Sequence, residues 1–309
     1  MKKYIIGMDG GGTSTKAKLY PVQDDGQLGE AVEGIIVGST NVNSNSHVEI
    51  QENFHKIWQA LGSEHVLAVG LGVAGLSTVG AEEKLRTYMR HAGFPEQVTL
   101  KGDHEIALRG AFDKQAGMLL IAGTGSICFG QSPSGHLTRA GGYGYLIDDI
   151  GSAFSIGLSM LKHWIWAYDK RIESSAMLEH MTGEFAQSGV PLDVAMDLAY
   201  HQPFIKARIA DLASIFSMYL ERGDIWAEII AEEQLEALAT LVKTVRKSLD
   251  SDKVPLVYSG GVLVHNQIIR EKLSLRLEQE GIVILDQDVD APLGAARFAK
   301  EDYYARYVS

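Results

Sequence analysis

IGMDGGGTSTKAKLY, at residues 6–20, is the stretch that decides the fold. An apolar strand ends in Asp9, three glycines follow, and beyond them small or apolar side chains alternate with Lys16, Lys18 and Tyr20. A period of two is typical of a strand, so the segment is predicted to be a β-hairpin. A P-loop requires G-x-x-x-x-G-K-[ST] followed by a helix, and this segment has neither the Lys-Ser or Lys-Thr pair nor a helical pattern.

The turn of this hairpin has the composition of a phosphate-binding loop. Gly10, Gly11 and Gly12 permit positive φ and leave room for a phosphate to approach the backbone. Successive N–H groups of a turn can form a concave anion site. Thr13 adds a hydroxyl donor, and Lys16 adds positive charge. We therefore expect a phosphate here, although glycine turns are also common in hairpins that bind nothing.

A second copy of this pattern, LLIAGTGSICFG, occupies residues 119–130. It again consists of an apolar strand, a glycine turn and a returning strand. Two similar halves, each with such a turn, indicate a nucleotide gripped between them, and the recurrence favours this interpretation over two ordinary turns. The residues of the second turn are Gly123, Thr124, Gly125 and Ser126.

The two copies differ in chemistry, because only the first carries an acid before its glycines. Aligning Gly10 with Gly123 places Asp9 opposite Ala122. Magnesium is typically bound by one or two carboxylates together with water and phosphate oxygens. A single carboxylate beside one end of a triphosphate suits that ion, so we expect Asp9 to hold Mg²⁺ through water.

The composition restricts the class of protein. The chain has 309 residues, more than one typical domain. Its formal net charge of −11 at pH 7 disfavours a nucleic acid or an anionic membrane as a partner. Cys128 is the single cysteine, which excludes disulfides, a cysteine-based zinc site and a self-contained iron–sulfur cluster. The N-terminal apolar stretch is too short for a signal peptide and no segment has the length of a membrane span, so a cytoplasmic protein is expected.

Hydrophobic periodicity predicts an α/β protein of two domains, residues 1–114 and 115–309, with a helical insertion at about 151–250. Each half begins with three strands and continues with alternating strands and helices, the pattern of a layered α/β domain. The expected strands are 3–9, 14–21, 31–38, 65–73, 97–101, 117–123, 126–131, 136–141, 254–258 and 282–285. The expected helices are 46–61, 79–92, 104–113, 151–168, 175–187, 191–200, 203–220, 225–249, 263–279 and 291–302.

A series of motifs carries a resemblance to a known superfamily. DGGGTSTK at 9–16, an acid at Asp103, AGTGS at 122–126 and YSGGV at 258–262 occur in the order of the actin-like ATPases, which include sugar kinases, heat-shock chaperones and actin. The chain is most similar to the N-acetylglucosamine kinase and dehydratase-activator ATPase family. The resemblance covers essentially the whole chain. It implies duplicated actin-like ATPase (ribonuclease H-like) domains, an interdomain cleft, and ATP and Mg²⁺ as cofactors.

The resemblance assigns the adenosine site to Gly260 and Gly261, where a glycine pair lets a flat group lie against the backbone. A tight strand-to-helix turn would explain the same pair without a ligand. APLGA at 291–295 resembles the final small-residue helix, which is expected to pack at the domain junction.

The resemblance also assigns residues to the sugar-binding site. Asn41, in the loop Gly38-Ser39-Thr40-Asn41, matches the sugar loop of N-acetylglucosamine kinases. Its amide has both a donor and an acceptor for vicinal hydroxyls, although an Asx turn explains the same residues. GGYGYLIDDIGS at 141–152 matches a further sugar segment, and Gly142, Tyr143 and Asp149 are carried over from it.

The same segment departs from the family pattern at two positions. The family has glycine where this chain has Asp148, and glutamate where it has Ile150. Losing that glutamate removes a polar group near the sugar. The identity of the sugar is therefore left open, whereas the kinase class is not.

Asp103 lies at a strand end where a helix begins. The family's catalytic aspartate has this position, so we expect Asp103 to contact the sugar and to accept the proton of its hydroxyl. A helix N-cap is the alternative, because aspartate is a preferred cap. Phosphoryl transfer through a loose transition state needs orientation of the hydroxyl more than basicity.

These inferences predict an ATP-dependent kinase that phosphorylates the 6-hydroxyl of an amino sugar, most readily N-acetylglucosamine. Glucosamine and N-acetylmuramic acid are alternative substrates. A nucleotide-gated ATPase, either an activator or a regulatory binding protein, is an alternative of another class. The expected partners are the sugar, ATP and, from the resemblance, a second copy of the chain in a homodimer.

Overall fold

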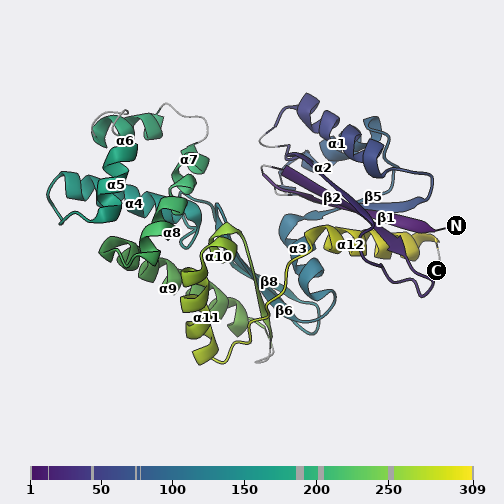
Figure 1. Cartoon of the computed structure of the whole chain (residues 1–309). Coiled ribbons are helices and arrows are strands. Elements are labelled where there is room, and N and C mark those ends of the chain that lie inside the picture. The colour runs from purple at the N-terminus through teal and green to yellow at the C-terminus, as the bar shows by residue number, and fades with distance from the viewer. Residues whose placement is uncertain are drawn as a thin grey trace. The chain divides into compact units, whose positions relative to one another are not determined.

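The computed structural model describes residues 2–12, 14–42, 45–73, 75–76, 78–185, 191–200, 205–249 and 254–307 (Figure 1). The chain forms two compact units. Unit 1 contains Met1–Gln115 and Gln287–Ser309, and unit 2 contains Ala116–Asp286. The expected second domain, 115–309, therefore differs from unit 2 at its C-terminal end, because the last helix packs on the first unit.

In the described residues of unit 1, a five-stranded mixed sheet of order β3-β2-β1-β4-β5 is covered by four helices. β1 pairs antiparallel with β2 and parallel with β4, so the first hairpin continues into a parallel half-sheet. The expected hairpin is confirmed. The strands are β1 Lys3–Gly10, β2 Ser14–Val22, β3 Glu33–Gly38, β4 Val66–Val73 and β5 Val98–Gly102, and the helices are α1 His47–Leu61, α2 Ala81–His91, α3 Asp103–Phe112 and α12 Ala291–Tyr307.

The alternation in the hairpin sorts its side chains between two faces of the sheet. Ile6, Met8 and Ala17 are fully buried and belong to the core formed with α1 and α2. Ile5 and Tyr20 belong to a smaller core on the opposite face with Ala296 and Ala299 of α12, which is why that helix lies in unit 1. Successive strand residues point to opposite faces, so Lys16 and Lys18 share the α12 side with Tyr20.

α12 lies close to the sheet and to α3 because glycines line its contacts (Figure 1). A Cβ on Gly7 of β1 would lie 1.9 Å from the carbonyl oxygen of Pro292, and one on Gly70 of β4 would lie 2.1 Å from that of Ala295. Gly294 makes the reciprocal contact with α3. The APLGA motif is therefore a packing motif within unit 1.

Gly294→Ala is expected to lower the free energy of unfolding by about 3 kcal/mol, the upper end of overpacking costs. The added methyl would lie 1.8 Å from the carbonyl oxygen of Ile106 and 2.7 Å from the amide nitrogen of Gly110, and backbone atoms cannot move aside cheaply. Thermal melting of the whole chain tests this. Gly183→Ala is the matched control: Gly183 lies in helix α5 (Ala176–Glu184) with open space around it, so that variant should melt at the wild-type temperature or slightly above.

Unit 2 repeats the strand order of unit 1 with one strand fewer. Its sheet is β8-β7-β6-β9, with β6 antiparallel to β7 and parallel to β9. The expected strand at 282–285 is reduced to a single bridge between Leu256 and Ile284, in the position that β5 has in unit 1. The strands are β6 Gly117–Ala122, β7 Ser126–Gln131, β8 Leu137–Gly141 and β9 Leu256–Ser259.

Helices make up the rest of unit 2, and two of the expected helices are each split in two. The 203–220 segment breaks around Leu212, and the 263–279 segment breaks at Asn266, whose side chain accepts the amide N–H of Ile269 and so begins a new helix. The helices are α4 Ala153–Tyr168, α5 Ala176–Glu184, α6 Pro191–Tyr200, α7 Ile205–Asp211, α8 Ala213–Glu221, α9 Ile225–Lys247, α10 Gly261–His265 and α11 Gln267–Gln279.

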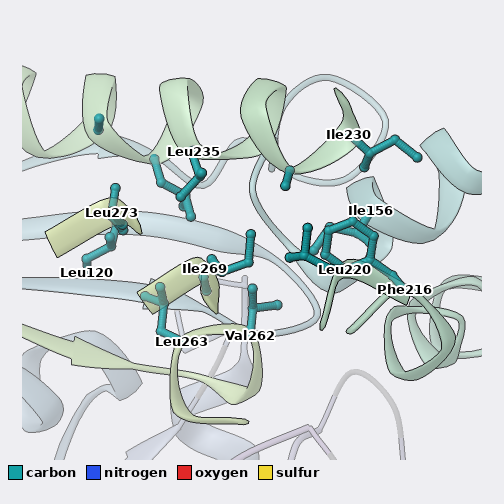
Figure 2. Close-up of a cluster of buried hydrophobic side chains, with 14 of the residues drawn as sticks. Leu120, Ile156, Phe216, Leu220, Ile230, Leu235, Val262, Leu263, Ile269 and Leu273 are labelled. Atoms are coloured by element: carbon teal, nitrogen blue, oxygen red, sulfur yellow. The ribbon is translucent and has the colours of Figure 1, made fainter. Parts of the chain in front are cut away.

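A single apolar core joins these helices to the sheet of unit 2 (Figure 2). It includes Leu120 of β6, Leu235 of α9 and Leu273 of α11, all fully buried. Cys128 of β7 lies in the same core, and burial raises the pKa of its thiol. Cys128 is therefore a buried thiol of the core. No helix in the described part of the chain is long and apolar enough to cross a membrane.

Candidate active site

The carboxyl ends of the parallel strands of unit 1 bring two aspartates to one edge of the sheet. Asp9 lies at the end of β1, and Asp103 directly follows β5 as the first residue of α3. β4 lies between the two strands, and its Gly72 is paired with Asp9. In open α/β sheets, ligands bind outside the carboxyl ends of the strands. This edge is therefore the candidate site of unit 1.

Asp9 carries negative charge that the protein does not fully compensate. Burial, followed by the neighbouring Asp103 and Asp290, raises the pKa of Asp9 from its usual 3.8 to about 6, while Lys16 acts in the opposite direction. Lys16 lies directly across the hairpin from Asp9. Because repulsion by two further carboxylates persists, the position favours a cation.

The carboxylate oxygens of Asp9 and the neighbouring Asp103 are of the kind that Mg²⁺ prefers as ligands. Among the described residues, no group of three or more histidine, cysteine or acidic side chains lies close enough to hold a metal by itself. An ion at Asp9 would therefore complete its coordination with water and phosphate oxygens, as Mg²⁺ commonly does.

Asp103 is half-exposed and points its carboxylate at the start of α3. Its Oδ1 accepts the backbone N–H of His104 at 2.9 Å, and the Nδ1 of the same histidine lies 3.4 Å away. Burial by itself raises the pKa of Asp103, but the hydrogen bonds from His104 outweigh it, so the net pKa is lowered. The N-cap position belongs to Gly102, whose amide donates to Glu105 at 2.7 Å. The carboxylate is therefore ionised and is not the N-cap.

The glycine turn of unit 1 is closed by a hydrogen bond from the Gly11 amide to the Ser14 carbonyl, at 3.0 Å. None of its three glycines has a positive φ, so the left-handed conformation that glycine permits is not used here. Space is the reason for the first: a Cβ on Gly10 would lie 2.8 Å from Oγ1 of Thr40. A Cβ on Gly12 would have no heavy atom of the described residues within 4 Å. Thr13 lies outside the described residues.

The loop of Asn41 lies against this turn. Ser39 donates its hydroxyl to the carbonyl of Gly11 at 2.8 Å and accepts the amide of Asn41 at 3.1 Å. The amide of Thr40 donates to the hydroxyl of Thr15 at 3.0 Å. The structure therefore brings together two motifs, around Gly11 and Asn41, that are about thirty residues apart in the sequence.

Asp290 is a residue of this site that sequence reasoning missed. Its carboxylate accepts hydrogen bonds from Nζ of Lys18 at 2.9 Å and from the hydroxyl of Tyr20 at 3.0 Å, and it caps α12 through the amide of Leu293 at 3.2 Å. It also contributes to the raised pKa of Asp9. The signal available in the sequence was the Asp-Ala-Pro start of a helix, which identifies a cap but no site.

In unit 2, the second glycine turn is also closed by a backbone hydrogen bond, but it is one residue shorter than the first. Ala122 pairs with Ser126, and the Gly123 amide donates to the Gly125 carbonyl at 2.9 Å. Neither glycine has a positive φ. The Ser126 hydroxyl donates to the carbonyl of Ile150 at 2.8 Å, which fixes the following loop against the turn.

That loop carries the three residues assigned to the sugar in this unit. Asp149 is buried with φ of 64°, and its Oδ2 would lie 2.8 Å from a Cβ on Gly125. Gly142 has φ of 74° and is crowded by Ile127. Tyr143 is exposed, and the Arg139 guanidinium lies 5.0 Å from its ring centre. Within unit 2, Asp149 therefore contacts the glycine turn directly.

A pocket of about 360 Å³ lies beside this turn. Gly123, Thr124 and Gly261 line it, so the structure brings two of the sequence motifs to one cavity. Gly260, with φ of 90°, packs against the end of β6, where a Cβ would lie 2.5 Å from the backbone of Ala122. The remaining lining residues are Ala153, Ile156, Ala210, Asp211, Ala213, Ser214, Ser217, Val262, His265 and Asn266.

The wall contributed by α7 and α8 was not foreseen from the sequence. Ile156 and Val262 form the apolar floor and belong to the core cluster of unit 2 (Figure 2). Ser217 and Asn266 form the polar side, where the Asn266 amide donates to the serine hydroxyl at 2.8 Å. An apolar floor with a few polar groups is typical of a pocket for a small molecule or cofactor.

Two sheets of the same strand order, each with a glycine turn after its first strand, define an actin-like ATPase fold. The chain belongs to the BadF/BadG/BcrA/BcrD ATPase family, whose sequence profile matches residues 6–299. The resemblance drawn from the motifs is thereby confirmed.

Individual relatives are similar over nearly the whole chain. A protein of Clostridium acetobutylicum named N-acetylmuramic acid/N-acetylglucosamine kinase is 28% identical, covering 97% of this chain and 99% of its own. An N-acetyl-D-glucosamine kinase of Dictyostelium discoideum is 27% identical, covering 96% and 98%. A solved structure from Chromobacterium violaceum, provisionally assigned as an N-acetylglucosamine kinase, has a TM-score of 0.72 at 23% identity, covering 96% and 98%. That last likeness establishes the fold.

Proposed function

We propose that this chain is an ATP-dependent kinase that phosphorylates the 6-hydroxyl of an amino sugar, with N-acetylglucosamine as the expected substrate. One observation carries the proposal. Asp9, Asp103 and the Gly10–Gly12 turn share an edge of unit 1, in a chain whose whole length is similar to two named amino sugar kinases.

The nucleotide is assigned to the glycine turns and to the pocket of unit 2. The turns Gly10–Gly12 and Gly123–Ser126, with Lys16, would hold the phosphates through the N–H groups that remain once the amides of Gly11 and Gly123 have closed the turns. Gly260 and Gly261 would border the adenosine, whose flat base suits the apolar floor beside Ile156. Mg²⁺ bound at Asp9 would neutralise charge on the phosphate oxygens.

Asp103 is assigned as the catalytic base. Its lowered pKa keeps it ionised at neutral pH, so it can accept a hydrogen bond from the sugar hydroxyl and orient it toward the terminal phosphate. A loose transition state requires little nucleophilic push, so a weak base in the right place is sufficient.

The sugar itself is assigned to Asn41, Asp103, Gly142, Tyr143 and Asp149. N-acetylmuramic acid is the second candidate, because the Clostridium acetobutylicum relative is named for both sugars. A homodimer is part of the same proposal, and size-exclusion chromatography with light scattering would test it.

A panel of sugars tests the proposed function directly. In the presence of ATP and Mg²⁺, the rate of ADP release should rise at least about 100-fold when N-acetylglucosamine is added. The reason is that orienting the acceptor hydroxyl at the phosphate is a large catalytic effect. Glucosamine, N-acetylmuramic acid, N-acetylmannosamine and glucose would be tested alongside it, with mass spectrometry of the product to locate the phosphate. ATP hydrolysis that no sugar accelerates would instead support the nucleotide-gated alternative.

A further inference from the structure

Lys206 of α7 forms an ion pair with Asp149, the buried carboxylate beside the glycine turn of unit 2. Its ammonium nitrogen is 3.7 Å from Oδ2 of Asp149 and 5.3 Å from the ring centre of Tyr145. Four residues further along α7, Ala210 lines the pocket. Residues four apart lie on the same face of a helix, so Lys206 and Ala210 share the face of α7 that borders this cavity.

The carboxylate that holds Lys206 is also in contact with the turn. Oδ2 of Asp149 would lie 2.8 Å from a Cβ on Gly125, so one oxygen contacts both the turn and the ammonium. The Asp149 side chain is 5% exposed, whereas that of Lys206 is 37% exposed. A buried anion beside a phosphate turn opposes the binding of a polyphosphate, because like charges at short distance repel strongly where water is excluded. A cation at this position removes that opposition.

The backbone around Asp149 keeps this carboxylate fixed. A left-handed conformation is uncommon for a residue other than glycine and persists only where surrounding contacts impose it. The Ser126 hydroxyl binds the carbonyl of Ile150, and the side-chain oxygen of Gln234 accepts the Gly151 amide at 2.8 Å. The ammonium of Lys206 is consequently held at the edge of the turn.

We propose that Lys206 is a phosphate-binding residue, which attracts the polyphosphate of a nucleotide seated in the pocket of unit 2. This inference rests on the proposed function, because it takes an adenine nucleotide as the ligand. Asp149 positions the ammonium, and the exposed part of the lysine side chain leaves N–H donors for phosphate oxygens. The helical insertion would in this way contribute charge that the glycine turn itself lacks.

Isothermal titration of the full chain with adenosine, AMP, ADP and ATP tests the proposal. K206M should weaken ATP binding about 10-fold, which is about 1.4 kcal/mol, and ADP binding less, while adenosine binding changes less than about 2-fold. K206R should retain most of the ATP affinity. R208M is the matched control, since Arg208 lies on the same helix but pairs with Asp197 at 3.2 Å, and it should bind all four ligands like the wild type.

Testing K206M in a chain that also carries D149N distinguishes two roles of Lys206: binding phosphate and merely neutralising Asp149. D149N keeps the left-handed backbone, which asparagine tolerates well, and removes the buried charge. If Lys206 contacts phosphate, K206M should still weaken ATP binding in the D149N background. If the lysine only neutralised Asp149, its replacement would have no effect there, and the proposal would be overturned.

Two further results would also overturn it. One is an equal loss of affinity for adenosine and ATP in K206M, which would indicate a structural role; the other is unchanged ATP binding in K206M. In both cases the proposed kinase function would stand. A wild-type chain that binds no adenine nucleotide would overturn both proposals together.

Discussion

Asp103→Asn is expected to lower kcat for sugar phosphorylation by about 10³-fold, within the range of general base catalysis. The asparagine keeps the size and most of the polar contacts of the side chain but cannot accept a proton. The KM values for ATP and the sugar should change less than about 3-fold. Losing an interaction that is made only in the transition state lowers kcat and leaves KM nearly unchanged. Steady-state kinetics with single-turnover quench would separate chemistry from product release.

The matched control for this variant is Asp113→Asn, at the other end of α3. The two carboxylates have similar exposure, 49% for Asp103 and 53% for Asp113. Asp113 has φ of 54°, which asparagine also tolerates. The control should retain wild-type kcat. Full activity in Asp103→Asn would remove this residue from the catalytic role and direct attention to Asp9 or to a base in unit 2.

Much of this fold follows from local patterns, because its strands and most helices have clear periodicity. The two hairpins are an example: glycine tips and alternating side chains predict them within about one residue of the observed bounds. The exceptions depend on tertiary contacts. The 282–285 segment has a strand-like composition, yet only one bridge to Leu256 forms, and the break at Asn266 depends on which group its amide reaches.

The candidate site could be predicted where one short motif contains the residues concerned. It could not be predicted where residues from distant segments come together in the fold. Asp9, Asp103 and the turn of Gly123 could be named from short motifs. Asp290 and Lys206 could not be named in this way, because their partners, Lys18 and Asp149, are distant in the sequence and are brought close only by the fold. Of the two reasons given for glycine in these turns, close approach is the one that fits Gly10 and Gly125, where a Cβ would lie 2.8 Å from a side-chain oxygen, whereas positive φ is not used.

Asp9→Asn is expected to stabilise the free protein while removing Mg²⁺-dependent ATP binding. The pKa of Asp9 is raised in the folded state, so the ionised form is disfavoured there. Below pH 3.8 the group is protonated in both the folded and unfolded states, and above about pH 6 it is charged in both, so the folded state loses stability as pH rises between these values. At pH 8 the neutral asparagine should raise the free energy of unfolding by up to about 3 kcal/mol, with no gain at pH 3.5.

The loss of function should be as large as the gain in stability. Without the carboxylate, Mg²⁺ should no longer increase the affinity for ATP. The ATP affinity measured with Mg²⁺ should therefore be about 10²-fold lower than that of the wild type, as is typical when residues around a bound metal are replaced. Melting curves from pH 3.5 to 8, and ATP titrations with Mg²⁺ or EDTA, would measure the two effects separately.

The two aspartates should also be coupled. Because Asp103 contributes to the raised pKa of Asp9, Asp103→Asn should move that pKa down from about 6 toward its usual value. The carboxyl resonance of Asp9 in an NMR titration of the free protein would report this shift, whatever the activity of the variant. An unchanged midpoint would mean that Asp103 does not contribute to the pKa of Asp9, and that the two carboxylates are not coupled electrostatically.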